Sequence, residues 1–279
     1  MVLNLQDLTD TLAWILLRAP EWGVNIPENL RIKLERKFKE CAHELYKEPD
    51  YCEVAYEKAD DLVTDFKAWC LRGDNPQTYL NNQLEDAKNE FITSYDLELR
   101  AALCTDKYVT DFCRPDEDAK RLYFGYHFDC NVRKHGKKVD EIEISHEFIQ
   151  VITDMQEKMR EQIVAKCISI ETNPTSNKLI STFKRYDEHP IFTFYNYGLS
   201  GTPSQTQLSV SINTDDQGVF ETAIENEYAL LIRALEQKTD SAGKCMYSRE
   251  QIYSYIRNVR KMGHRQSFKM SKEQLSSAT

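Results

Sequence analysis

The sequence contains no Cys-x-x-Cys pair, although it has eight cysteines. They are scattered along the chain and do not show the spacing of a zinc knuckle, and a disulfide framework is the less favoured alternative. We therefore expect reduced, mostly buried thiols in an intracellular protein. The eight positions are Cys41, Cys52, Cys70, Cys104, Cys113, Cys130, Cys167 and Cys245.

The sequence also lacks an apolar run long enough to cross a membrane. A membrane-spanning helix needs about 20 apolar residues, and the run at residues 12–17 is far shorter. The first residues show neither the basic region nor the cleavage site of a signal peptide. These absences predict a cytoplasmic protein without a membrane partner.

An excess of basic residues is missing as well. The chain has 36 Lys and Arg against 45 Asp and Glu, which gives a formal net charge of -9. Sequence-independent binding to a phosphate backbone needs clustered positive charge. We therefore do not expect a nucleic-acid polymer as a partner, whereas a nucleoside or nucleotide remains possible.

The first part of the chain, residues 1–115, is predicted to be mostly helical. Apolar residues recur there at helical spacing, and prolines separate the segments. One helix ends near Pro20 and a second begins at Pro27. A third is expected at 53–71 and a fourth at about 77–103. A polar cluster after Cys113 marks the expected boundary with a second region at 116–279.

Helices and strands alternate in this second region. The aromatic run 121–129 has the composition of a buried strand, and a basic loop is expected after it at 133–138. Such alternation favours a parallel sheet, so the predicted fold class is α/β, with a partial (β/α) TIM-barrel-like C-terminal region behind the helical one. Further strands are expected at 167–171 and 208–213, and further helices at 145–166, after Pro190, at 223–235 and at 247–262.

Two adjacent carboxylates, Asp215 and Asp216, follow the predicted strand at 208–213. Side by side they repel each other, and in a closed pocket one of them would be pushed toward protonation unless a metal or a donor satisfied it. In a parallel α/β barrel, a loop after a strand lies at the catalytic face. The alternative is structural, because acids at a helix N-terminus also cap the helix.

Polar segments follow two of the predicted strands directly. Glu-Thr-Asn-Pro-Thr-Ser-Asn occupies residues 171–177, and Ser-Ile-Asn-Thr-Asp-Asp occupies residues 211–216, with His189-Pro190 between them. The loops after parallel barrel strands lie around one mouth and build a site together. We therefore expect these two segments to converge.

These ordered motifs resemble the closing part of the adenosine-deaminase-like metal-dependent hydrolases, over about residues 126–268. The Asn-Pro form of the first motif and the Asp-Asp-Gln-Gly-Val-Phe run at 215–220 resemble the branch found in prokaryotic antiviral systems, which includes the RADAR deaminase subunit and the CRISPR-associated adenosine deaminases.

The resemblance implies a zinc-dependent site. Asp215 corresponds to the zinc ligand that also positions the attacking water, and Asp216 to the residue that contacts the purine ring. Zinc lowers the pKa of its bound water to near 7, which makes this pairing chemically sensible. Asn173, Ser176 and Asn177 correspond to the substrate-side loop, whose backbone their hydrogen bonds would fix.

The family's histidine motifs are missing from this sequence. No His-x-His pair, His-Ala-Gly-Glu-type segment or Arg-Ile-Gly-His-Gly-type segment occurs, and His189 corresponds to a residue at a helix start rather than to a ligand. Only His127, at the end of the aromatic run, has a position from which it could face a barrel mouth. Its alternative role is that of a hydrogen-bonded core histidine. Zinc needs about three protein ligands, and deamination also needs a proton donor.

Three interpretations follow. The first is an adenosine or adenine-nucleotide deaminase-like protein of an antiviral defence system, active only if another chain supplies the missing groups. The second is a catalytically inactive scaffold that binds a nucleotide or assembles with a partner. The third is a split or truncated fragment that is stable only in a homo- or hetero-oligomer, because a half-barrel exposes an apolar flank.

Overall fold

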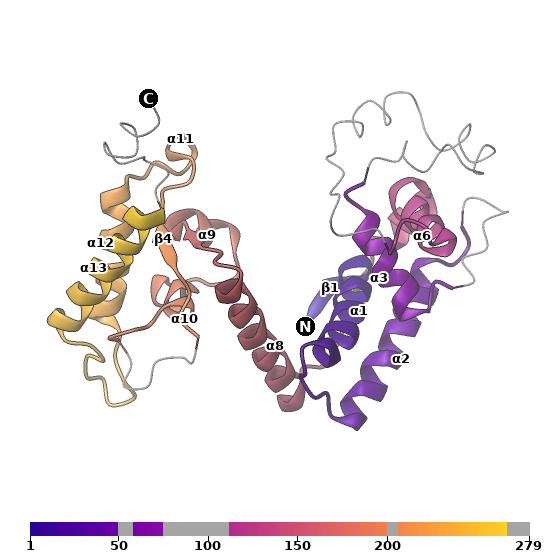
Figure 1. Ribbon diagram of the computed structural model, residues 1–279, viewed down its shortest axis with the longest axis horizontal. Helices are drawn as coiled ribbons and strands as arrows, with labels where there is room; N and C mark the ends of the chain where they lie inside the picture. Colours follow the sequence, from indigo (N-terminus) through magenta and orange to yellow (C-terminus); the bar gives the residue numbers. More distant parts are fainter. Residues whose placement is uncertain (50–57, 75–111, 200–205, 267–279) are drawn as a thin grey trace. The chain divides into compact units, whose positions relative to one another are not determined.

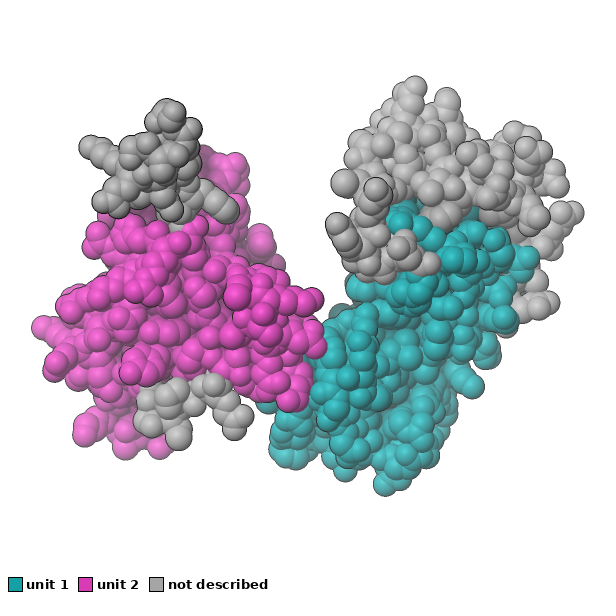
Figure 2. Space-filling view, viewed as in Figure 1, with its two compact units in different colours: residues 1–155 teal, residues 156–279 magenta. Residues whose placement is uncertain are grey.

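The computed structural model describes residues 1–49, 58–74, 112–199 and 206–266. The chain divides into two compact units, Met1–Met155 and Gln156–Thr279, shown in teal and magenta in Figure 2. This division falls inside a long helix, whereas the sequence placed a boundary at 115/116. The two helices that follow residue 115 are grouped with the first unit.

Unit 1 is built mainly from helices (Figure 1). The expected helices up to Pro20 and from Pro27 are present, and the third begins at Leu62. The fourth expected helix, at 77–103, lies outside the described residues. The elements are β1 (Val2–Asn4), α1 (Leu5–Glu21), α2 (Glu28–Leu45), α3 (Leu62–Leu71), α6 (Glu117–Phe128), α7 (Cys130–Gly136), β2 (Val139–Glu141) and the first part of α8 (His146–Ala165).

Side-chain caps start four of these helices. Asn4, Asp61, Asp116 and Asp129 each accept a hydrogen bond from a backbone N–H in the first turn of the helix that follows. Such a cap stabilises a helix by about 1 kcal/mol. The local sequence therefore determines where these helices begin, and apolar packing determines how they are held.

The core of unit 1 lies where α1, α2, α3 and α6 pack together. Each large apolar side chain that is fully buried there contributes about 1.5–3 kcal/mol by leaving water. The largest fully buried apolar side chains of these helices include Leu8, Leu12, Ile15, Leu34, Phe38 and Leu71.

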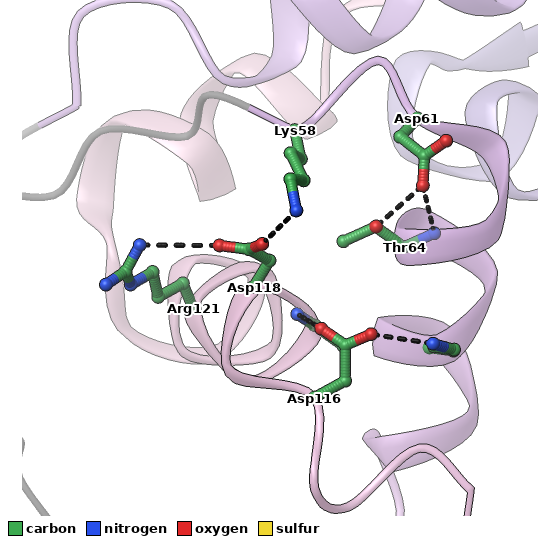
Figure 3. A network of polar contacts seen from close by, with 8 residues as sticks. Lys58, Asp61, Thr64, Asp116, Asp118 and Arg121 are labelled. Carbon is green, nitrogen blue, oxygen red and sulfur yellow. Dashed lines mark hydrogen bonds and ion pairs between the residues drawn. The ribbon is translucent and has the colours of Figure 1, made fainter.

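Polar contacts join the beginning of α3 to the beginning of α6 (Figure 3). The Lys58 ammonium lies 2.8 Å from the Asp118 carboxylate, which also pairs with Arg121 at 3.4 Å. The Lys67 ammonium lies 2.7 Å from Asp116, the N-cap of α6. Exposed ion pairs stabilise little, so the Lys58 contact orients the two helices more than it holds them, whereas the Lys67–Asp116 pair is partly buried.

The strand predicted at 121–129 is wrong, because this segment belongs to helix α6. Ala119, Leu122, Tyr123 and His127 recur at spacings of three and four and are all buried, which is the pattern of a helix face. The aromatic composition suggested a strand, but the Asp116 cap and this spacing favour a helix. Most of the loop expected at 133–138 is likewise helical, in α7.

Unit 2 alternates helices with two short strands (Figure 1). The expected strands at 167–171 and 208–213 correspond to β3 and β4, and the helices expected at 223–235 and 247–262 correspond to α12 and α13. The elements after α8 are β3 (Ile170–Thr172), α9 (Pro174–Ile180), the 3-10 helix η2 (Tyr186–Glu188), α10 (Ile191–Phe194), β4 (Val210–Ile212), α11 (Gln217–Phe220), α12 (Ile224–Gln237) and α13 (Arg249–Gln266).

The strands β3 and β4 pair in parallel, as expected. Ile170 lies opposite Val210 and Thr172 lies opposite Ile212. Val210 and Ile212 pack against the apolar sides of α12 and α13. Within the described residues the sheet has these two strands only, so the fold is a mixed α/β arrangement, and no closed barrel is present in that part of the chain. None of the described helices is both long and apolar enough to span a membrane.

Asp65 is a buried carboxyl group in α3 of unit 1. Its carboxyl is 1% exposed, and neither oxygen has a hydrogen-bond partner in the described part of the chain. Burial, aided by the nearby Asp10 carboxylate, raises its pKa from 3.8 to about 7. The folded state therefore holds this proton more tightly than the unfolded state, so stability is complete below pH 4 and falls as the pH rises toward 7.

We expect the Asp65→Asn variant to remove this decline and to be more stable than the unchanged protein at pH 8, by about 1–3 kcal/mol. Urea unfolding at pH 5 and pH 8 measures the free energy of unfolding of each variant. Tryptophan fluorescence reports on unit 1, because all three tryptophans lie there. Glu40→Gln on the exposed face of α2 is the control. Equal pH dependence in Asp65→Asn and the unchanged protein would contradict this role.

Candidate functional site

The two polar segments leave the sheet at the same end. β3 ends at Thr172 and β4 ends at Ile212, which lie opposite each other. The backbone N–H of Asn213 donates to the carbonyl of Thr172 over 2.9 Å, which extends the ladder by one bond. Because the strands are parallel, the segment 173–177, which is Asn173 and the start of α9, and the loop at 213–216 both follow their carboxyl ends.

Ser176 and Asp215 connect these two loops. The Ser176 hydroxyl donates a 2.8 Å hydrogen bond to Oδ2 of Asp215. Ser176 is 1% exposed, whereas Asp215 is exposed and has a left-handed backbone with φ of 59°. This conformation is uncommon for residues other than glycine, and Asp and Asn adopt it more readily than most. The structure therefore brings these two predicted residues together.

Asn177 organises the start of α9. Its side-chain oxygen accepts the Asn173 backbone N–H at 3.0 Å and lies 3.1 Å from Nε2 of His189. The Ile191 backbone N–H donates to Nδ1 of the same ring over 3.1 Å. Nδ1 must therefore be unprotonated, which places the ring proton on Nε2, toward Asn177. His189 lies at the start of α10, as the sequence indicated.

Asp216 caps the short helix α11. Its Oδ1 accepts the backbone N–H groups of Gly218 at 2.9 Å and of Val219 at 3.3 Å. Both of these bonds end on Oδ1. The two adjacent acids therefore differ: Asp216 has the capping role that was the structural alternative, whereas Asp215 bonds to the neighbouring loop.

Glu227 is a buried carboxyl group that the motif comparison did not identify. It is 0% exposed. Its Oε2 accepts the Thr175 backbone N–H at 2.8 Å, and its Oε1 accepts the Thr222 hydroxyl at 2.5 Å. A signal for it was present in the sequence, because Glu227 is spaced by four residues from Leu231 on the apolar side of α12.

The residues present do not by themselves fit a zinc site. Within the described ranges, no group of three or more His, Cys, Asp or Glu side chains is arranged to hold a metal ion. Asp215 offers one carboxylate, whereas zinc needs about three protein ligands. His127 lies in α6 of unit 1, while Asp215 belongs to unit 2.

A cavity of about 1180 Å³ lies beside β4, between α12 and α13. None of the five predicted site residues lines it. Its walls combine apolar side chains with polar groups of both charges, and they include Glu171, Ser211, Asn213, Tyr228, Arg260 and His264.

His189 is a buried histidine beside the two motif segments. Burial lowers the pKa of this ring from 6.5 to about 4. Between these values the unfolded chain binds the proton and the folded chain does not, so stability is complete above pH 6.5 and falls as the pH drops toward 4. Protonation would also break the bond from the Ile191 N–H.

We expect the β3 and β4 amides to lose protection from hydrogen exchange between pH 7 and pH 4.5, after correction for the intrinsic pH dependence of exchange, because unit 2 loses up to about 3 kcal/mol. His189→Gln should weaken this dependence, and His264→Gln, at an exposed histidine of unit 2, should leave it unchanged. An acid response that persists in full in His189→Gln would rule out this ring as its source.

Comparisons with known proteins cover part of this region. Residues 143–244 match the family described as adenosine deaminase. The adenosine deaminase of Shewanella loihica is 39% identical over 71 residues, which are 25% of this chain and 19% of that protein. The adenosine deaminase of Plasmodium gallinaceum is 41% identical over 61 residues, covering 22% and 14% of the two chains.

The aminodeoxyfutalosine deaminase of Streptomyces coelicolor is 35% identical over 78 residues, which are 28% of this chain and 18% of that protein. The chain thus spans about a fifth of the length of the curated relatives that it matches. The segment that carries β3, β4 and both polar loops is similar to an adenosine deaminase domain.

Proposed function

We propose that unit 2 supplies one part of an adenosine-deaminase-type active site, which is completed by groups from outside the described residues. The observation that carries this proposal is the Ser176–Asp215 hydrogen bond. It joins the two motif loops at the carboxyl ends of parallel strands, inside the segment that is similar to adenosine deaminases. The reaction would hydrolyse the amino group of adenosine or an adenine nucleotide and release ammonia.

In this proposal Asp215 is a zinc ligand. Ser176 occupies one of its carboxylate oxygens and so fixes the orientation of the group, which is what a ligand needs before the metal binds. When bound, zinc would supply an activated water. Because Asp215 is alone among the described residues, the remaining ligands and the proton donor must come from another chain or another part of the protein.

The substrate in this proposal is a purine nucleoside or nucleotide. Asp216 would use Oδ2 to contact the purine, since Oδ1 caps α11. Ser176 and Asn177 are engaged inside the loop, and the side-chain oxygen of Asn173 is buried without a partner among the described residues. We therefore assign Ser176 and Asn177 to shaping the substrate-side segment, in which Asn177 holds the backbone N–H of Asn173, and expect Asp216 to make the direct contact.

The proposal extends to a role in antiviral defence within an oligomer. Its support is the resemblance of the Asn-Pro motif and of the 215–220 run to the deaminases of prokaryotic antiviral systems. Exposed apolar side chains favour assembly, and unit 2 has several close to the motif loops. Leu179 and Ile180 of α9 are 66% and 75% exposed, and Val219 of α11 is 67% exposed.

A second candidate is a catalytically inactive scaffold that binds a nucleotide or a partner. The observation that favours it is the lack of a metal-binding group within the described ranges. This candidate predicts that a nucleotide raises the melting temperature without turnover and that a chelator does not change this effect.

The decisive experiment places the matching segment in a complete enzyme. We expect this chain alone to be free of zinc and to release no ammonia from adenosine or ATP. A chimera of the Shewanella loihica adenosine deaminase, in which residues 143–244 of this chain replace the corresponding segment, is expected to bind zinc and deaminate adenosine. Asp215→Asn should lower its kcat/KM by about 100-fold or more, because a ligand is lost.

The control in the chimera is Asn226→Ala, at an exposed position in the first turn of α12, which should retain zinc and activity. A folded chimera that keeps full activity with Asp215→Asn would contradict the assignment. Zinc and ammonia release by the unmodified chain would instead show that it is complete by itself.

A further inference from the structure

Glu227 is buried at a position where an apolar residue would be expected. It lies in the first turns of α12, and the residues four and eight positions later, Leu231 and Leu235, are 0% and 1% exposed. Burying a carboxyl group costs free energy unless donors satisfy it. Its two oxygens accept hydrogen bonds from two donors, one in the first turn of α9 and the other in the connection between α11 and α12.

Each oxygen of Glu227 holds one of the two motif-bearing segments. Oε2 accepts the backbone N–H of Thr175 at 2.8 Å, in the first turn of α9, which carries the Asn-Pro-Thr-Ser-Asn motif. Oε1 accepts the hydroxyl of Thr222 at 2.5 Å, in the connection between α11 and α12. Glu227 therefore bridges the start of α9 and the segment that continues from the acid pair.

Together with the chain, these bonds form a closed ring of contacts that includes Asp215. Thr175 is followed directly by Ser176, whose hydroxyl donates to Asp215. From Asp215 the chain continues through α11 to Thr222, which returns to Glu227. Asp215 has a left-handed backbone that needs support from its surroundings. A closed ring of this kind limits both the backbone and the carboxylate of Asp215.

We propose that Glu227 is the positioning residue of this site: by holding Thr175 and Thr222 it keeps Ser176 against Asp215. This role of Glu227 rests on the proposed function, because it presupposes that Asp215 belongs to an active site. The arrangement of the loops can nevertheless be tested in the full chain without any activity.

The test is hydrogen exchange of the full chain, measured by mass spectrometry over the segments 173–178 and 213–217. We expect Glu227→Leu to increase exchange in both segments by at least about 10-fold, because the ring opens. Glu227→Gln keeps one acceptor oxygen for the Thr175 N–H, and its amide can donate to the Thr222 hydroxyl, so protection should return to within about 3-fold of the unchanged protein.

Two controls separate positioning from general loss of stability. Leu231→Ala removes a fully buried side chain one turn further along α12 and weakens unit 2 as a whole, and it should raise exchange in β3 and β4 as much as in the loops. Glu225→Leu, at an exposed position on the same helix, should change exchange neither in the strands nor in the segments 173–178 and 213–217.

If Glu227→Leu does not fold, the amide resonance of Thr175 decides the question. We expect Glu227→Gln to shift it, together with that of Ser176, while the Asn173 amide, which is bound by Asn177, stays in place. Unchanged loop protection in Glu227→Leu, or an unchanged Thr175 resonance in Glu227→Gln, would overturn the proposal. An inactive chimera would count against the proposed function alone and leave this result intact.

Discussion

The parallel pairing of β3 and β4 is the constraint on which the site depends. Each strand has three residues, and so short a pair is marginal by itself. Side chains reinforce it: the Thr172 hydroxyl donates to the carbonyl of Ser211, and the Asn213 amide donates to Glu171. A shift of one residue would turn every side chain to the other face and would separate the two loops. The register therefore positions the two motif segments relative to each other.

The adjacent acids show how this geometry resolves a local conflict. Two neighbouring carboxylates repel each other when their side chains point the same way. The left-handed backbone at Asp215 turns the chain between them, so that Asp215 bonds to Ser176 while Asp216 bonds to the start of α11. Each acid has its own donors. The pair is therefore compatible with folding before any ligand is present.

Local signals in the sequence predicted much of this arrangement. Apolar alternation located β4, the polar segments marked the strand ends, and the order of strand and helix indicated parallel pairing, so the meeting of Ser176 and Asp215 was foreseeable. The part played by Glu227 was not, since it depends on a contact with Thr175, which lies 52 residues away in the sequence. A carboxylate within an apolar helix stripe was the one available hint.

The aromatic run at 121–129 shows the opposite case, in which composition misled. Tyr and Phe are common in strands because they pack well on a pleated surface, yet here they lie in α6, where Tyr123 packs in the helical core and its hydroxyl donates to the carbonyl of Asp74 over 2.8 Å. The helix cap at Asp116 and the spacing of the buried residues outweighed the composition. Tertiary packing decided between two locally acceptable structures.

The pairing of β1 with β2 has a consequence for synthesis on the ribosome. Val2–Asn4 find their partners in Val139–Glu141, so almost the whole of unit 1 must be translated before this small sheet forms. Until then the backbone groups of the first strand are open to water and to other nascent chains. Because domains generally fold as units during translation, this closure is a late event, and a pause in translation before residue 141 would leave the unit incomplete.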